Sequence, residues 1–538
     1  KGLLALGVKP QDKVGLISEN CVEWNMLDFA IQQIGAVVVA VYPNIADNDY
    51  KFIFQDAQIN ISIVSSASLY QRLQALQSDI PSLQKIYAIH EFPQSNNYQE
   101  IIEAGTSISD ERLQAAKDAV QSEDLASLIY TSGTTGNPKG VMLSHKNLIA
   151  DMLSSEYSFP VVAYDRALTF LPVCHAYERT FHYVYLYKGL TIYFAQSIET
   201  IGEDMKAVKP HIFSAVPRVL EKVYEKILAA GERLTGVKKS LFFWALALGE
   251  QYDFTGKSAW YTFQLSIARK LIFSKWQEAL GGEVKGIATG SASLQEKLIK
   301  LFLAADIAIY EGYGLTEAAP CLTVNDYRRG MKIGTVGLPL INIDIKLAED
   351  GEILAKGDNI MMGYYNNPEA TAEVIKDGWL YTGDIGTWVD GKFLKIIDRK
   401  KEMFKTSGGK YIVPQQMESK LVESKFIEQV MVVGEGQKFP SALLVPTYTA
   451  LLEWAKVHAP AIVALPRNEF LLHAAIAKKL DAEIEAINPQ FGNWEQIKKY
   501  AILPDEFTIE GGELTPTLKM KRKFILQKYK ENYDSIYA

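Results

Sequence analysis

Cysteine is scarce in this chain of 538 residues, which contains only Cys21, Cys174 and Cys321, far apart in the sequence. This number and spacing exclude a disulfide framework and a cysteine-based zinc site. Unpaired thiols are typical of a reducing compartment, so we predict a cytoplasmic protein. No signal peptide is visible, and the first residues, Lys1 to Gly7, resemble the end of a helix. We therefore expect a further segment before Lys1.

Long apolar runs and a strong excess of one charge are also lacking. No apolar run reaches the roughly 18–20 residues that a helix needs to span a bilayer. The formal net charge of −7 gives no overall attraction to nucleic acid, so we predict no nucleic-acid partner and only local anion binding. With 48% hydrophobic and 22% charged residues, the composition is that of a globular protein. At roughly 150 residues per domain, the length predicts three or four structural units.

The first third of the chain alternates short aliphatic or β-branched runs with amphipathic stretches. Uninterrupted apolar strands between helices are typical of parallel sheets that are covered on both faces. The predicted strands are Val14–Ile17, Val37–Tyr42, Ile61–Val64 and Lys85–Ile89, followed by Ile192–Phe194, Ile212–Val216, Gly286–Thr289 and Ile307–Tyr310. We predict an α/β fold whose main part is a large, layered α/β N-terminal body.

Between residues 221 and 282 the strands stop and the sequence predicts long helices. Basic and aromatic residues alternate in this segment, for example Lys257, Trp260, Lys270 and Trp276. One interpretation is a helical layer whose aromatic side chains pack inward. The other is an amphipathic surface that makes peripheral contact with a membrane. The sequence alone leaves both interpretations open.

After Gly334 the pattern changes to that of antiparallel hairpins. Two strand-like runs, 387–389 and 393–397, flank an Asp390-Gly391 pair, which is a strong short-range signal for a hairpin turn. We predict an antiparallel β subdomain at about residues 335–398. Beyond it, mixed strand and helix patterns predict a small α+β C-terminal domain. The predicted domains are therefore 1–398 and 399–538.

The most informative segment is Tyr130-Thr-Ser-Gly-Thr-Thr-Gly-Asn-Pro-Lys-Gly140. Glycines let the backbone approach a ligand closely, hydroxyl groups supply donors, and Lys139 supplies a positive charge, which together suit a polyphosphate. The spacing does not fit the G-x-x-x-x-G-K-[ST] pattern of P-loop NTPases. We predict that a polyphosphate is bound by Thr131, Ser132, Gly133, Thr134, Thr135, Gly136 and Lys139.

Five ordered motifs resemble those of the adenylate-forming superfamily, which includes acyl-CoA synthetases, luciferases and the adenylation domains of peptide synthetases. They are Thr131–Gly140, Tyr310–Glu317 (YEGYGLTE), Tyr381–Asp384 (YTGD), the stretch from Asp398-Arg399 to Ser407-Gly-Gly-Lys410, and Lys519 in LTPTLK. The resemblance covers essentially the whole chain. It implies a large body with a small mobile α+β cap, and it implies ATP, Mg²⁺ and coenzyme A as cofactors and co-substrates.

The resemblance also implies a role for each motif position. Glu317, together with Thr134, is expected to hold Mg²⁺, which binds one or two carboxylates plus substrate phosphates. Thr316 is expected to donate to the α-phosphate, and Lys519 to stabilise the charge that develops when a carboxylate attacks this phosphate. The nucleoside is expected to be bound by Gly290, Ser291, Ala292, Glu311, Gly312, Tyr313, Gly314, Asp384 and Arg399.

Two further segments point to the long-chain branch of this family. Residues 171–180, LPVCHAYERT, resemble the His-x-Tyr-Glu-Arg stretch of long-chain acyl-CoA synthetases, and Thr515–Lys519 resembles their version of the lysine motif. We therefore predict a long-chain fatty acid–CoA ligase in which His175 has a catalytic role near the acyl chain or a phosphate. The alternative is a structural hydrogen-bonding role for Tyr177, Glu178 and Arg179.

The predicted reaction joins a fatty acid to AMP, with release of pyrophosphate, and then transfers the acyl group to the thiol of CoA. The resemblance implies that the cap turns about Lys401 between the steps. This turn removes Lys519 and brings in the pantetheine-binding residues Ser407, Gly408, Gly409 and Lys410. Two alternatives stay open: a fatty acyl-AMP ligase that delivers to a carrier protein, and a non-catalytic lipid-binding protein on the same fold. The oligomeric state is also open, a homodimer included.

Overall fold

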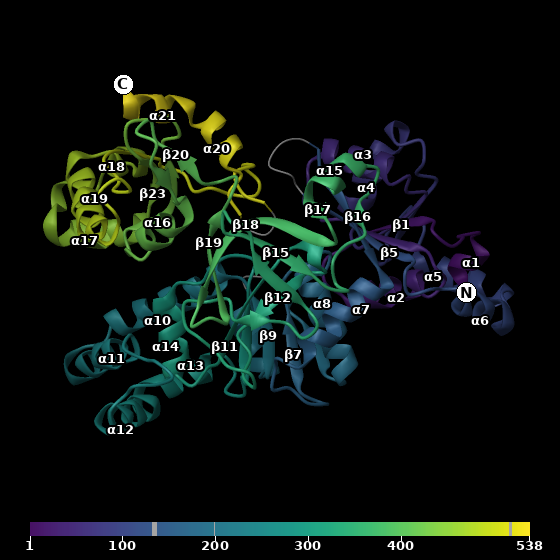
Figure 1. Cartoon of the computed structure of the whole chain (residues 1–538), viewed down its shortest axis with the longest axis horizontal. Helices are drawn as coiled ribbons and strands as arrows, with labels where there is room; N and C mark the ends of the chain where they lie inside the picture. The colour runs from purple at the N-terminus through teal and green to yellow at the C-terminus, as the bar shows by residue number, and fades with distance from the viewer. Residues whose placement is uncertain (132–136, 198–199, 516–518) are drawn as a thin grey trace. The chain divides into compact units, whose positions relative to one another are not determined.

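The computed structural model describes residues 1–131, 137–197, 200–515 and 519–538 (Figure 1). The chain divides into two compact units. The first unit comprises Lys1–Lys346, Leu354–Thr382 and Trp388–Lys395, and the second comprises Leu347–Ile353, Gly383–Thr387 and Ile396–Ala538. Each unit buries its own clusters of apolar side chains.

The first unit contains a sheet of seven described strands with the order β16-β6-β5-β2-β1-β3-β4. These strands are β1 (Lys13–Ile17), β2 (Val37–Ala40), β3 (Ile61–Val64), β4 (Lys85–Ala88), β5 (Leu125–Thr131), β6 (Lys139–Ser144) and β16 (Gly363–Tyr364). β1 to β5 are parallel, whereas β6 and β16 are antiparallel to their neighbours. β2 and β3 are buried along their whole length, as expected for apolar strands that helices cover on both faces.

A second sheet in this unit has the order β13-β12-β11-β10-β9-β7-β8. Its strands are β7 (Arg166–Thr169), β8 (Thr191–Phe194), β9 (Ile212–Ala215), β10 (Gly286–Thr289), β11 (Ile309–Gly314), β12 (Cys321–Val324) and β13 (Leu338–Pro339). β7 to β11 pair in parallel, and β12 runs antiparallel to β11. The sequence predicted the end of β11 at Tyr310, but the strand continues through Gly314 because it pairs with β12.

Helices surround both sheets of the first unit. They are α1 (Gly2–Ala5), α2 (Val22–Gln32), α3 (Asp47–Asp56), α4 (Ala67–Leu76), α5 (Tyr98–Ala104), α6 (Asp110–Asp118), α7 (His145–Glu156), α8 (Ala176–Lys188), α9 (Ile201–Val208), α10 (Pro217–Glu232), α11 (Gly236–Gly249), α12 (Ala259–Ala268), α13 (Ser274–Ala279), α14 (Glu296–Ala304) and α15 (Pro368–Val374). The long helices predicted between residues 221 and 282 are thus present as α10 to α13. No helix in the described part of the chain is long and apolar enough to cross a membrane.

A third sheet has the order β14-β15-β18-β17, and β19 pairs with β18. Its strands are β14 (Asp344–Leu347), β15 (Glu352–Lys356), β17 (Ile375–Lys376), β18 (Trp379–Val389) and β19 (Phe393–Arg399). Asp390 and Gly391 join β18 to β19 with φ values of 51° and 70°, so the predicted hairpin turn is present with positive φ at both positions. β18 begins well before the predicted 387–389, so the Thr-Gly-Asp segment lies inside a strand.

The second unit mixes short strands with helices. Its strands are β20 (Phe404–Lys405), β21 (Tyr411–Ile412), β22 (Ile427–Val433), β23 (Ser441–Pro446) and β24 (Tyr500–Ile502). Its helices are α16 (Pro414–Leu421), α17 (Tyr448–His458), α18 (Arg467–Leu471), α19 (Ala474–Ile487), α20 (Arg522–Lys528) and α21 (Lys530–Tyr537). The predicted fold class, a large layered α/β body followed by a smaller mixed domain, is confirmed.

Candidate active site

The predicted phosphate loop joins two antiparallel neighbours of the first sheet. Thr131 ends β5 and Lys139 begins β6, and the two residues are paired in the strand register. The loop therefore starts and ends at the same end of the β5–β6 pair. The predicted residues Ser132, Gly133, Thr134, Thr135 and Gly136 lie outside the described residues.

Lys139 and Glu317 are brought together by a tyrosine that the sequence analysis missed. The ammonium of Lys139 lies 4.9 Å from the centre of the Tyr364 ring. The hydroxyl of Tyr364 donates a hydrogen bond of 2.8 Å to Oε1 of Glu317. The ring of Tyr364 thus contacts the ammonium of Lys139, which suits a phosphate, and its hydroxyl contacts the carboxylate of Glu317, which suits a metal ion. Tyr364 lies in the short strand β16, far from both residues in sequence, and no local pattern marks it as functional.

The glycines of the predicted nucleoside-binding segments lie where backbones cross closely. A Cβ at Gly314 would lie 1.9 Å from the carbonyl oxygen of Pro320, so only glycine fits the β11–β12 crossing. A Cβ at Gly290 would lie 3.2 Å from the carbonyl oxygen of Gly312. The end of β10 therefore meets β11 beside Tyr313, which is half-buried. Ser291 has a φ of 72°, and Ala292 is exposed.

Glu311 anchors the loop after β10. Its Oε1 accepts a hydrogen bond of 3.1 Å from the backbone N–H of Leu294, and its side chain is buried. Burial raises the pKa of the Glu311 carboxyl to about 8, which keeps this group largely neutral at pH 7. The side chain thus positions the Gly290–Leu294 loop, and the predicted place of Glu311 among the nucleoside-binding residues stays a prediction.

Buried polar groups hold the turn that carries Thr316 and Glu317. Asn359 donates hydrogen bonds of 2.8 Å to the carbonyl oxygens of Ala318 and Cys321. Asp151, on α7, accepts a bond of 3.0 Å from the N–H of Cys321. Burial raises the pKa of the Asp151 carboxyl well above its ordinary range. An aspartate in the middle of a helix resembles a surface residue in the sequence, which is why Asp151 was missed.

His175 caps the N-terminus of α8. Its Nδ1 accepts a hydrogen bond of 3.2 Å from the backbone N–H of Tyr177, which leaves Nε2 as the protonated nitrogen in the neutral ring. Its ring centre lies 6.3 Å from that of Tyr42. The cap gives His175 a structural function, and its predicted role near the acyl chain or a phosphate stays a prediction.

Glu178 and Arg179 fill the structural role that the sequence left as an alternative. Both are fully buried. The carboxylate of Glu178 accepts hydrogen bonds from the hydroxyls of Thr169 and Ser214. The guanidinium of Arg179 pairs with Asp28 and donates to Tyr183 and Ser127. Buried charges persist only where such partners surround them, so these two residues tie α8 to α2 and to the strands beside it.

In the second unit, Asp384 and Arg399 form an ion pair. Nε of Arg399 donates to Oδ1 of Asp384 at 3.0 Å. Asp384 is buried, whereas the Arg399 side chain is 40% exposed. The neighbouring Lys400 bonds to Asp350 and Glu352 at 2.6 and 2.8 Å.

The predicted hinge and pantetheine residues lie on exposed turns. Lys401 follows the end of β19 and precedes β20, and it is exposed. Ser407 to Lys410 join β20 to β21, and all four are exposed. The N–H of Thr406 donates to the carbonyl of Lys410 at 3.0 Å, and Gly409 has a φ of 75°, as a tight hairpin turn requires. The ammonium of Lys410 lies 5.3 Å from the Trp494 ring centre.

Lys519 lies at the base of a short loop and is exposed. Its backbone exchanges two contacts with Thr515: its carbonyl accepts from the N–H of Thr515 at 2.8 Å, and its N–H donates to the Thr515 hydroxyl at 3.0 Å. Leu514 and Met520 form an antiparallel bridge just outside this pair. These contacts define the backbone at Lys519, and the residue is exposed.

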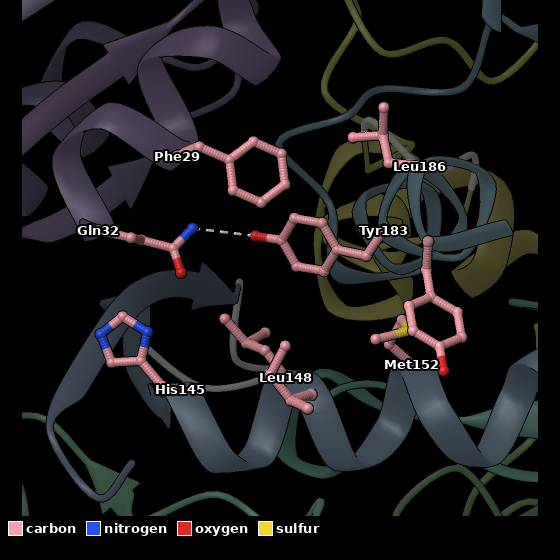
Figure 2. Close-up of a pocket in the computed structure, with 9 residues that line it drawn as sticks. Phe29, Gln32, His145, Leu148, Met152, Tyr183 and Leu186 are labelled. Atoms are coloured by element: carbon pink, nitrogen blue, oxygen red, sulfur yellow. Dashed lines mark hydrogen bonds between the residues drawn. The ribbon is translucent and has the colours of Figure 1, made fainter. Parts of the chain in front are cut away.

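A separate apolar pocket of about 220 Å³ lies between α2, α7 and α8 (Figure 2). Figure 2 shows Gln32 bonded to the hydroxyl of Tyr183 at one side, with Leu148 and Met152 of α7 below. None of the predicted site residues lines this pocket. It is therefore not the nucleotide site that the motifs predict.

The described residues of the predicted metal site suit a cation that its substrate would largely hold. Among the described residues, no group of three His, Cys, Asp or Glu side chains is placed to hold a metal ion. Glu317 supplies one carboxylate, and the Tyr364 hydroxyl bonds to only one of its oxygens. Mg²⁺ in phosphoryl-transfer sites commonly binds one or two carboxylates plus phosphate oxygens, so this arrangement suits Mg²⁺ that arrives with a nucleotide.

Comparison with known proteins agrees with this geometry. Residues 1–365 match the family described as AMP-binding enzyme, and residues 402–538 match the AMP-binding enzyme C-terminal domain. The chain therefore belongs to the AMP-binding enzyme family. Its relatives include the long-chain-fatty-acid–CoA ligase FadD15 of Mycobacterium bovis, 32% identical over 100% of this chain and 90% of that protein. Human long-chain-fatty-acid–CoA ligase 1 is 31% identical over 98% of this chain and 79% of its own length. The predicted resemblance is thus confirmed.

Solved structures support the same fold. The adenylation domain of a carboxylate reductase from Mycobacterium chelonae matches with a TM-score of 0.77 and 22% identity, over 100% of this chain and 82% of that one. A fatty acyl CoA synthetase from Mycobacterium tuberculosis matches with a TM-score of 0.61 and 21% identity, over 98% and 89% of the two chains.

Proposed function

We propose that this protein is an ATP-dependent long-chain fatty acid–CoA ligase that forms acyl-AMP first and acyl-CoA second. In the first step a carboxylate oxygen of the fatty acid attacks the α-phosphorus of ATP. A bond from oxygen to phosphorus forms, the bond to the β-phosphate breaks, and pyrophosphate leaves. In the second step the sulfur of CoA attacks the acyl carbonyl, the thiol loses its proton, and AMP leaves with the electron pair of the broken bond.

The first unit supplies groups for the nucleotide in this proposal. Lys139 and the phosphate loop bind the phosphates, and Thr316 donates its hydroxyl to the α-phosphate. The faces of Tyr313 and of the Gly290–Ala292 loop bind adenine. Glu317 and Thr134 would hold Mg²⁺, which when bound neutralises charge on the phosphates.

The second unit supplies groups for the ribose and for the chemistry. Asp384 accepts hydrogen bonds from the ribose hydroxyls, and Arg399, which pairs with Asp384, reaches the ribose or a phosphate. The ammonium of Lys519 stabilises the charge that builds up as two anions approach each other. The Ser407–Lys410 turn binds the pantetheine of CoA after a rotation about Lys401.

The observation that supports this proposal best is the group formed by Lys139, Tyr364 and Glu317. The tyrosine places an ammonium and a carboxylate beside a turn that Asp151 and Asn359 hold in place. A lipid-binding protein without catalysis has no need for a phosphate-binding lysine next to a metal-binding carboxylate. Relatives that are long-chain fatty acid–CoA ligases support the choice of substrate and acceptor.

Pyrophosphate release, measured with ATP and Mg²⁺ over acids from acetate to oleate, tests the proposal. We expect turnover with palmitate or oleate that requires CoA, and acyl-CoA as the product. Glu317→Gln should abolish this turnover, because it removes the carboxylate charge. Glu369→Gln, which changes an exposed glutamate of the same unit, is the matched control.

Release that occurs with fatty acid but does not depend on CoA would favour a carrier protein as the acceptor. No release with any acid, in a folded protein that still binds ATP, would contradict the catalytic proposal and favour a lipid-binding function.

A further inference from the structure

The helix α12 has two apolar faces, of which only one is packed. Tyr261, Leu265 and Ala268 are buried in the apolar cluster that this helix shares with α11 and α14. On the other side the exposed large residues are Trp260, Phe263, Ile267 and Leu271, with exposed fractions of 66%, 55%, 36% and 52%. Their spacing of three and four residues places them along one stripe that continues into the π-helical turn Arg269–Phe273.

The inward-packing interpretation of these aromatic residues holds only in part. The inward interpretation holds for Phe242, Tyr261, Phe273 and Trp276, which are buried. It does not hold for Trp260 and Phe263, whose rings stack on each other at a centre distance of 5.7 Å and remain exposed. Figure 1 shows α12 at the outer end of the helical group formed by α10 to α14.

Basic residues are frequent in the segment that carries the stripe. Residues 236–276 contain six lysines and arginines and two acidic residues, in a chain whose net charge is −7. Two of the six are paired with acids outside this range, Arg269 with Asp306 and Lys275 with Glu278. One of the two acids, Glu250, is paired with Lys297. Lys257 and Lys270 are exposed, and among the described residues neither lies within ion-pair distance of a carboxylate. Cations without acidic partners beside exposed aromatic rings leave the positive charge open to an external anionic surface.

A second exposed apolar surface in the same unit lacks this feature. Phe29, Ile149 and Tyr187 are exposed around the pocket of Figure 2. The lysines at this surface are paired: Lys146 with Glu123 and Asp358, and Lys188 with Glu156. The stripe on α12 is therefore distinguished by its charge rather than by apolar exposure alone.

We propose that the α12 stripe is a docking surface for a lipid bilayer that contains anionic headgroups. Trp260, Phe263, Ile267 and Leu271 enter the interfacial region, where the amphipathic ring of tryptophan is especially well accommodated. Lys257 and Lys270 lie at the level of the anionic headgroups, where each basic residue adds attraction that salt screens. The proposal goes beyond the ligase reaction, and its test does not depend on catalysis.

Sedimentation with vesicles tests the proposal, using phosphatidylcholine alone and phosphatidylcholine mixed with phosphatidylglycerol. We expect the full chain to bind the mixed vesicles, to bind neutral vesicles much more weakly, and to lose binding as salt rises. The double variant Trp260→Ser/Phe263→Ser should lower the partition coefficient about tenfold or more. The variant Lys257→Glu/Lys270→Glu should lower it by a similar factor for mixed vesicles, with little change for neutral ones.

Each variant has a matched control. Ile149→Ser/Tyr187→Ser removes comparably exposed apolar side chains from the surface at α2, α7 and α8, and it should leave binding unchanged. Lys85→Glu/Lys117→Glu reverses two exposed lysines elsewhere in the first unit and should have a much smaller effect than the α12 pair. Circular dichroism and thermal midpoints establish that all variants are folded.

Quenching by lipids with brominated acyl chains gives a second, direct readout. Trp260→Phe should remove most of the quenched tryptophan emission while it keeps vesicle binding. The proposal would be overturned if both α12 variants bound vesicles with the partition coefficient of the wild type. Equal binding of the wild type to neutral and mixed vesicles at all salt concentrations would also overturn it. So would self-association that needs Trp260 and Phe263 in a chain that does not bind vesicles, because the stripe would then be an interface between copies.

Discussion

Thr316 and Glu317 in the first unit lie on a turn that buried side chains hold, whereas Lys519 in the second unit lies exposed beside a short loop. Asn359 and Asp151 bond to the backbone of the first turn from fully or nearly fully buried positions. Among the described contacts, the backbone at Lys519 bonds to Thr515 and lies beside the Leu514–Met520 bridge. Segments with few buried contacts are the ones that open and move most easily.

This difference suits a reaction with two steps. Groups that bind the nucleotide must keep their positions through both steps, since AMP stays bound until the second is complete. A group that acts only in the first step can leave the site before the second step if it lies on a segment that moves easily. The contrast between a buried, hydrogen-bonded turn and an exposed lysine therefore leads to predictions that separate the two kinds of residue.

Lys519→Ala is expected to have the largest effect. It should slow formation of acyl-AMP by about 10³-fold, because the developing negative charge loses a positioned cation. Conversion of supplied acyl-AMP to acyl-CoA should change little. Separate assays of the two half-reactions test this, with Lys523→Ala, an exposed lysine of the same basic run, as control. Equal losses in both half-reactions would show that Lys519 is not specific to the first step.

Glu311→Gln should change stability more than chemistry. Burial raises the Glu311 pKa to about 8, so the folded protein holds a proton that the unfolded chain releases above its ordinary pKa. The stability of the wild type should therefore fall as pH rises from about 4.5 to about 8 and then level off. Glutamine, which stays neutral, should raise the free energy of unfolding at pH 7 by on the order of 3 kcal/mol.

Urea unfolding at a series of pH values measures this effect. Below about pH 4.5 the variant and the wild type should converge, because Glu311 is then protonated in both the folded and the unfolded chain. Parallel pH profiles for the two proteins would show that Glu311 is ionised in the folded state. Glu369→Gln serves as control: Glu369 is exposed, so replacing its carboxylate should leave the free energy of unfolding unchanged.

Lys401→Pro should have the smallest effect of the three, and only on the second step. Proline restricts φ where the chain is expected to turn, so acyl-AMP formation should continue while transfer to CoA slows about tenfold. Glu402→Ala in the same turn is the control for a general disturbance. Wild-type rates of overall turnover in Lys401→Pro would remove Lys401 from the role of pivot.

Much of the fold followed from local patterns. Apolar runs such as Ile61–Val64 and Gly286–Thr289 became strands with the predicted bounds, because a buried parallel strand needs apolar residues on both faces. The Asp390-Gly391 pair formed its turn because both residues tolerate positive φ. β11 ended later than predicted because Gly312 and Gly314 have weak strand preference by themselves and enter the strand through pairing with β12.

The candidate site was only partly predictable. Lys139 and Glu317 were identified from their motifs, whereas Tyr364 and Asp151 were not. Both missed residues act through contacts across more than 45 positions of sequence: Tyr364 reaches Glu317, and Asp151 reaches Cys321. A local pattern carries no information about such contacts. The aromatic residues around α12 show the same limit, since the sequence marked them as a group but not which of them face outward.

The sequence by itself determined the class of fold, the family and the chemical types of residue at the site, because strand and helix periods and ordered motifs are local properties of a chain. The tertiary structure decided which charges meet and which are buried. It raised the pKa values of Glu311 and Asp151 by removing water, paired Arg179 with Asp28, and left Trp260 and Phe263 exposed beside Lys257. Desolvation and pairing depend on neighbours that only the folded chain brings together.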